Sequence, residues 1–217
     1  MLFRYFGQQA AWERKGFRFK MPIKLLDSTL VSLTISVYDW AHYTTSKGAV
    51  KMHTLLDYDC LLPEFMNITG GKRTDNKAAF DIEIKPHSIV VADRGYCDYG
   101  LLNYWDSNNV FYVVRHKDDI QHRTIKELPL PEKHAQNVLL DEIIEFELPT
   151  AKDKCPKRLR RIAVWDEEHG FVIELLSNNV TLAASTIAKL YKARWNIEIF
   201  FHNLKQLLRI KSFIGIS

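Results

Sequence analysis

Apolar residues in the first third of the chain fall into short runs that are typical of β-strands. Three such runs cover residues 21–33, 48–57 and 61–69, and the chain between 38 and 47 is expected to form a loop. The first run is largely apolar and β-branched around a single acid, Asp27. The pattern therefore predicts that Asp27 lies within a first strand, and that the next two strands pair as antiparallel neighbours.

The middle of the chain alternates between helical and strand patterns. A helix is predicted over 74–84, and a continuous apolar run at 88–92 is typical of a strand that is covered on both faces. That run stops abruptly at Asp93. A short helix over 98–108 and a buried strand over 110–115 follow. Strands and helices in this succession predict a mixed α/β sheet flanked by helices.

The pattern changes between residues 116 and 179, where prolines interrupt the chain and no helix is predicted. We therefore expect a β-rich insertion subdomain over 116–179 within a single domain that spans residues 1–217. The strands expected inside the insertion cover 138–148, 158–165 and 171–176.

Helical periodicity returns in the last part of the chain, where four reactive side chains follow one another at suggestive intervals. Tyr191, Arg194, Glu198 and Lys205 lie at offsets of 0, 3, 7 and 14 residues. In one continuous helix these offsets correspond to about 0°, 300°, 340° and 320°, so the four side chains share a stripe about 60° wide. The neighbouring arc is apolar, which predicts a helix that is both part of the core and a candidate site. Taken alone, the Arg194–Glu198 spacing is equally explained by a surface ion pair.

Composition narrows the class of protein. The 217 residues are 47% hydrophobic with ordinary charge content, which excludes general disorder. No apolar run approaches the roughly 20 residues of a membrane span, and the first residues do not resemble a signal peptide, so we expect a cytoplasmic protein with no membrane partner. The three cysteines, Cys60, Cys97 and Cys155, are far apart and predict neither a disulfide framework nor a zinc site.

The charge distribution permits an anionic partner. The formal net charge is +4, and six bases crowd one short stretch around Pro156. That stretch is either a solvated turn or a loop that contacts phosphates. The six bases are Lys152, Lys154, Lys157, Arg158, Arg160 and Arg161.

Three acids stand out because of the elements that carry them: Asp27 in a first strand, Asp93 at the end of a later strand, and Glu198 on the last helix. Carboxylates that converge repel each other, and divalent cations relieve this repulsion best. Ligation by oxygen alone favours Mg²⁺ or Mn²⁺ over zinc, and two such ions support phosphodiester cleavage. Aspartates at strand ends also commonly cap turns, so a purely structural role remains open for each. Lys51 and His53 are weaker candidates to line the same site, and a strand pair with polar edges explains them more simply.

The chain resembles bacterial insertion-sequence transposases of the DDE class, in the group whose third acid lies in a Tyr-(2)-Arg-(3)-Glu-(6)-Lys signature. Tyr191, Arg194, Glu198 and Lys205 match that signature at every spacing, and residues 93–96 (Asp-Arg-Gly-Tyr) match the group's element around the second acid.

Two further segments extend the resemblance over nearly the whole chain. Residues 26–29 (Leu-Asp-Ser-Thr) are similar to the segment that bears the first acid, and residues 47–53 are similar to the strand that follows it. The resemblance implies an RNase H-like mixed sheet with a β-rich insertion before the last catalytic helix. It also implies two groups of site residues: Asp27, Asp93 and Glu198 as the catalytic acids that bind two divalent cations, Mg²⁺ (or Mn²⁺), and Tyr191, Arg194 and Lys205 as DNA contacts.

The activity implied by the resemblance is hydrolysis at the transposon ends, followed by strand transfer by the freed 3′-hydroxyl. The implied partners are double-stranded DNA, in the form of terminal repeats and target, and a second copy in a dimeric active complex near the nucleoid. Family members are typically longer at both ends, so we expect a truncated chain. The alternatives are a non-catalytic DNA-binding remnant and a generic metal-dependent nuclease.

Overall fold

The structure, a computed structural model, forms two compact units that are described separately. Unit 1 comprises Met1–Ile82 with Arg194–Ser217, and unit 2 comprises Glu83–Ala193. The predicted insertion, 116–179, falls within unit 2, and the expectation of a single domain over 1–217 stays a prediction. The structure describes residues 16–17, 19–33, 42–44, 47–117, 120–130 and 137–207.

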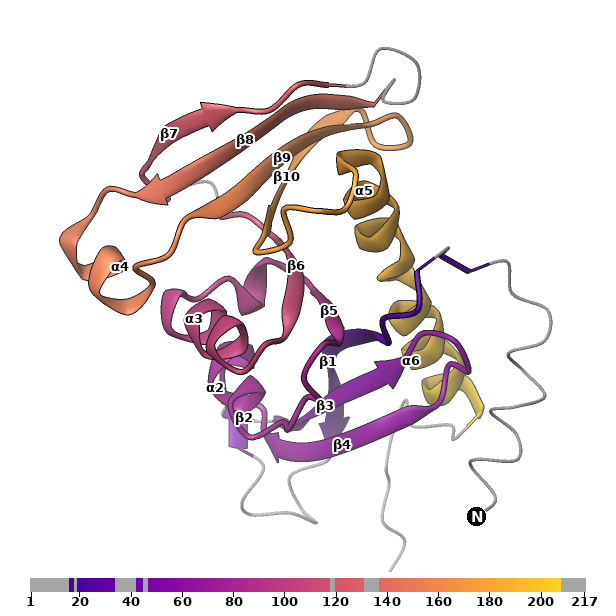
Figure 1. Cartoon of the computed structure of the whole chain (residues 1–217). Helices are drawn as coiled ribbons and strands as arrows, with labels where there is room; N and C mark the ends of the chain where they lie inside the picture. The colour runs from indigo at the N-terminus through magenta and orange to yellow at the C-terminus, as the bar shows by residue number, and fades with distance from the viewer. Residues whose placement is uncertain are drawn as a thin grey trace, which may run out of the picture. The chain divides into compact units, whose positions relative to one another are not determined.

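Unit 1 is built on three antiparallel strands, β1 (Ile23–Leu33), β3 (Lys47–Asp57) and β4 (Pro63–Gly70). β3 lies between the other two, as Figure 1 shows, and its register places Thr54 opposite Asp27. The order predicted for these strands is confirmed. The loop predicted over 38–47 is partly wrong, because residues 42–44 form a short strand, β2 (His42–Thr44), that pairs with the start of β3.

Two helices of unit 1 lie near β1. α6 (Trp195–Leu207) packs against β1, and α2 (Asp75–Ala79) is tied to the strand by a hydrogen bond from Ser28 to Asp75. α2 is shorter than the helix predicted over 74–84. It stops because the Asp81 amide donates to the Ala78 carbonyl in a turn.

Unit 2 contains one sheet in which a parallel pair joins an antiparallel array. β5 (Ile89–Ala92) runs parallel to β6 (Phe111–Arg115), and all four β5 residues are buried, as predicted for a strand covered on both faces. This combination of pairings confirms the mixed α/β class. The remaining strands follow in the order β6-β10-β9-β8-β7, with bounds β7 (His122–Glu127), β8 (Val138–Phe146), β9 (Leu159–Asp166) and β10 (Phe171–Ser177).

In the described part of unit 2, three helices and one 3₁₀ turn accompany the sheet. α3 (Tyr99–Ser107) begins at Asp98, whose side chain accepts a hydrogen bond from the Leu101 amide over 3.0 Å. The expectation of no helix between 116 and 179 is wrong, because α4 (Pro149–Lys154) forms there; a proline at its first position is a known start signal. The other two elements are η3 (Arg94–Tyr96) and α5 (Ala184–Ala193).

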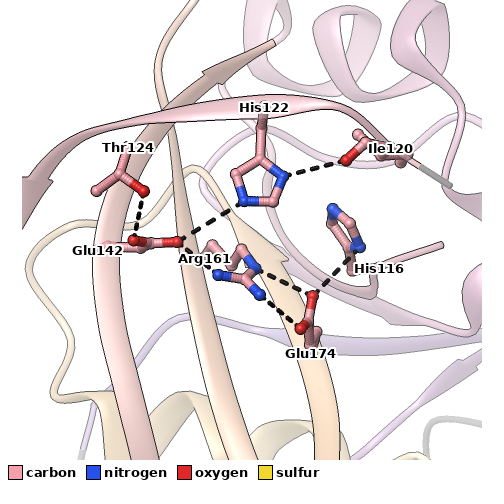
Figure 2. Close-up of polar contacts among 7 residues, drawn as sticks. All are labelled: His116, Ile120, His122, Thr124, Glu142, Arg161 and Glu174. Atoms are coloured by element: carbon pink, nitrogen blue, oxygen red, sulfur yellow. Dashed lines mark hydrogen bonds and ion pairs between the residues drawn. The ribbon is translucent and has the colours of Figure 1, made fainter. Parts of the chain in front are cut away.

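Buried ion pairs organise the β-rich part of unit 2. Adjacent strand residues point to opposite faces, so Arg160 and Arg161 reach different acids. Arg160 donates to both Asp141 oxygens over 2.7 and 2.6 Å, and both side chains are almost completely buried. On the other face, Arg161 lies between Glu142 and Glu174, with His116 and His122 beside these acids (Figure 2). The sequence alone suggested that Arg160 and Arg161 lie in a solvated turn or in a loop that contacts phosphates. Both lie in β9 instead, where acids bind them.

The Arg160–Asp141 pair generates a stability prediction. We expect Asp141→Asn to lower the free energy of unfolding by about 3–5 kcal/mol, because it leaves a buried guanidinium without its charge partner. Lys157→Gln, which removes an exposed cation from Asp106 in the same unit, is the control and should cost at most about 1 kcal/mol. The measurement is urea unfolding followed by tryptophan fluorescence. Equal losses in the two variants would contradict the assigned role of the buried pair.

Candidate active site

In unit 1, one guanidinium joins two of the predicted acids. The Nη1 atom of Arg194 lies 3.4 Å from Oδ2 of Asp27, and its Nη2 atom lies 2.7 Å from Oε1 of Glu198. The Arg194 side chain is 10% exposed, against 19% for Asp27 and 36% for Glu198. The two carboxylates are thus held at one point by a mostly buried cation, with Glu198 the more open to solvent.

Local structure explains how each of these side chains is oriented. Asp27 lies within β1, where its Oδ1 atom accepts a hydrogen bond from the Ser28 amide over 2.7 Å. Glu198 lies in the first turn of α6, where the helix dipole favours a negative charge. The guanidinium carbon of Arg194 lies 5.9 Å from the centre of the Trp195 ring, a cation–π distance.

In unit 2, the second predicted acid meets the predicted tyrosine. Asp93 directly follows β5 and stands at the N-cap position of η3. The Tyr191 hydroxyl, on α5, donates to its Oδ1 atom over 3.1 Å, and Tyr191 itself is 8% exposed. This hydrogen bond fixes the Asp93 carboxylate at the point where the buried strand ends.

The continuous helix predicted from Tyr191 to Lys205 is wrong. α5 ends at Ala193, Arg194 forms a turn, and α6 begins at Trp195, because the Ile197 amide bonds the Arg194 carbonyl and starts a new helix. The four residues therefore do not lie on one continuous helix. Glu198 and Lys205 do lie on one helix, and their seven-residue offset places them on the same face of α6.

Lys51 and His53 belong to a different polar group on the opposite face of the strands. Ser28, whose side chain points away from that of Asp27, donates to Asp75 over 2.6 Å. Lys51 Nζ lies 3.2 Å and His53 Nδ1 3.6 Å from the same Asp75 oxygen. The minor alternative, in which Lys51 and His53 line the Asp27 site, is therefore wrong, and the favoured interpretation as polar residues of a strand pair agrees with these contacts.

The sequence pattern does not single out Asp75, which lies inside the helix predicted over 74–84. A usable signal exists, because Lys51 and His53 are two residues apart on a strand and so project from the same face. A buried polar pair of this kind requires an acceptor from a covering element. Asp75, in the first turn of the next helix along the chain, accepts a hydrogen bond from Lys51 and lies 3.6 Å from Nδ1 of His53, whose Nε2 atom bonds Thr69.

Asp27 and Glu198, the two acids that Arg194 bridges, carry donor atoms that fit a divalent cation. Asp27 and Glu198 present carboxylate oxygens to one cationic group, and Mg²⁺ and Mn²⁺ prefer the same ligands. Within the described ranges, no three His, Cys, Asp or Glu side chains gather closely enough to hold a metal ion. The two acids thus have the donor chemistry that such a cation requires, and their assignment as metal ligands stays a prediction.

Comparison with known proteins decides the family. Residues 18–215 match a family model described as "Transposase DDE domain". The chain belongs to this transposase family. The predicted resemblance to DDE transposases is confirmed, whereas the roles assigned through the Tyr-Arg-Glu-Lys signature stay predictions.

Several relatives are similar over most of this chain. It is 30% identical over 194 residues to y4zB of Sinorhizobium fredii, a protein named as a transposase, covering 89% of this chain and 54% of the relative. It is 28% identical over 202 residues to the "Probable transposase for insertion sequence element IS5377" of Geobacillus stearothermophilus, covering 93% and 52%. The chain thus spans about half the length of the curated relatives it matches.

Among solved structures, the chain overlaps a cryo-EM structure of a piggyBac transposase synaptic complex with hairpin DNA. The overlap covers 87% of this chain and 40% of that one, with 11% identity and a TM-score of 0.49.

In the described part of the chain, no helix is long and apolar enough to cross a membrane.

The Asp75 group generates a pH prediction. Burial lowers the pKa of His53 below its ordinary 6.5, although Asp75 acts in the opposite direction. The unfolded state therefore binds a proton more readily, and stability should fall as pH drops below about 6.5. We expect the unfolding free energy to decrease more between pH 7.5 and 5.5 in the wild type than in His53→Gln. Equal decreases in urea titrations would contradict a buried neutral His53.

Proposed function

We propose that this chain is the catalytic core of a DNA transposase, which cleaves phosphodiester bonds at the ends of an insertion element and joins the freed 3′-hydroxyl to target DNA. The observation that carries the proposal is the convergence of Asp27 and Glu198 on one cation in a chain of the DDE transposase family. Two carboxylates held together so closely are costly unless a cation serves them.

Asp27, Asp93 and Glu198 are the proposed metal-binding acids, and all three fall within the span of the family match. Their oxygen-only donor set suits two Mg²⁺ or Mn²⁺ ions. When bound, such ions activate an attacking oxygen and stabilise the charge that develops on the leaving oxygen. The Ser28 amide and the Tyr191 hydroxyl each hold one carboxylate oxygen, which limits rotation of Asp27 and Asp93.

Arg194, Tyr191 and Lys205 are the proposed contacts to DNA phosphates. The planar guanidinium of Arg194 suits a phosphate as well as a carboxylate, and its position beside two acids offsets their repulsion of a polyanion. Lys205 lies on the same face of α6 as Glu198, so a backbone that approaches the acid also approaches the lysine. The Tyr191 hydroxyl binds Asp93, so a phosphate contact of Tyr191 would lie beside that acid.

The test is nicking of supercoiled plasmid by the full chain with Mg²⁺ or Mn²⁺. We expect Glu198→Gln, Asp27→Asn and Asp93→Asn each to slow nicking by about 10²–10³-fold, since loss of a metal ligand removes several kcal/mol of transition-state stabilisation. Asp81→Asn is the control, because Asp81 is an exposed acid bound to Arg73 and should leave the rate unchanged.

Nicking without metal, or nicking that Glu198→Gln leaves unaffected, would contradict the proposal. A second assay supplies an oligonucleotide with a free 3′-hydroxyl and measures its joining to the plasmid. Metal-dependent hydrolysis without joining would indicate a generic metal nuclease. Salt-sensitive DNA binding without any cleavage would indicate a non-catalytic remnant.

A further inference from the structure

Three long cationic side chains converge on one carboxylate in the β-rich part of unit 2. Glu145, on β8, lies 2.5 Å from Nη2 of Arg123 on β7 and 3.6 Å from Nζ of Lys152 on α4. Nε of Arg158, just before β9, lies 4.0 Å from the other Glu145 oxygen. Because three separate segments contribute, the tertiary structure creates this group, which we call the Glu145 cluster.

The cluster keeps its cations accessible while their common acid stays covered. The side chains of Arg123, Lys152 and Arg158 are 63%, 49% and 64% exposed, against 20% for Glu145. A hydrogen bond from Arg123, with the charges of all three bases, holds the pKa of Glu145 below its usual value, so the acid is ionised at neutral pH. One negative charge thus orders three positive ones and leaves a local surplus of two.

Three other bases in the basic stretch around Pro156 are each paired with one or two acids. Arg160 is bound by buried Asp141, and Lys157 is paired with Asp106. Arg161 is engaged by two carboxylates at once, as Figure 2 shows. The positive charge suggested by the sequence is therefore concentrated at the Glu145 cluster rather than spread along the stretch.

Neighbouring charges reduce the surplus without cancelling it. Glu147 and Asp153 are exposed acids close to the cluster in sequence, and Lys154 is an exposed base on α4. Asp153 and Lys154 are neighbours on α4 with opposite charges and add no net charge, so the three bases of the cluster outnumber Glu145 and Glu147 by one. The donors of Arg123 and Arg158 are also arranged in planar forks, which match phosphate oxygens.

We propose that Arg123, Lys152 and Arg158 form a binding site for the phosphodiester backbone of double-stranded DNA, with Glu145 holding the three bases in place. The proposal rests on the proposed transposase function and adds a contact surface outside the candidate active site. Backbone contacts of this kind fix the position of a duplex without reading its sequence.

The experiment measures binding of the full chain to a duplex of about 30 base pairs in EDTA, across a series of salt concentrations. We expect Arg123→Gln and Arg158→Gln each to weaken binding several-fold and to lower the slope of log affinity against log salt by roughly one. Lys152→Gln should act in the same direction. Lys154→Gln is the matched control, because Lys154 lies on the same helix but two residues, or about 200°, from Lys152 and should leave the slope unchanged.

Each outcome decides the proposal. An unchanged slope in both arginine variants, an equal effect of Lys154→Gln, or no DNA binding by the wild type would overturn it. Thermal unfolding of every variant checks that the exposed substitutions leave the fold intact. EDTA removes metal ions, so this binding assay is independent of the nicking assay. If nicking depends on metal but the cluster variants bind DNA like the wild type, only the proposed DNA site at the Glu145 cluster is refuted. If no nicking occurs, the catalytic proposal is refuted.

Discussion

Neutralisation of partly and fully buried carboxylates is the constraint on which both units depend. Removing a charge from water costs several kcal/mol unless a partner of opposite sign is close and well oriented. Arg160 meets this requirement for Asp141 with two short bonds, and Arg194 meets it for Asp27 and Glu198 together. In each case the arginine connects elements distant in sequence, so charge compensation also fixes tertiary structure.

Strand alternation distributes these charges over different faces. Asp27 and Ser28 are adjacent in β1, yet Asp27 contacts Arg194 and Ser28 contacts Asp75. Arg160 and Arg161 are separated in the same way in β9. A local run of polar residues therefore supplies two unrelated groups of contacts, and proximity in sequence says little about which side chains act together.

The family match and the geometry support each other at the candidate active site. Carboxylates that hold metal ions for phosphodiester chemistry must be rigid, and the structure provides specific restraints: the Ser28 amide for Asp27, the Tyr191 hydroxyl for Asp93, and the first turn of α6 for Glu198. The donors to Asp27 and Asp93 are a backbone amide and a hydroxyl, which orient a carboxylate without adding a charge, whereas Glu198 is also bound by the Arg194 guanidinium.

The sequence by itself determined the longer strands of unit 1, the buried character of β5, the candidate acids and the resemblance to the family, because hydrophobic period and residue spacing are local properties, but it missed the strands β2 and β7. It did not reveal the break at Arg194 or the small helix α4. Nor did it distinguish bases such as Arg161, which Glu142 and Glu174 neutralise, from Arg158, which stays exposed. Only the tertiary structure decided these points, because helix ends and charge partners depend on side chains that are distant along the chain.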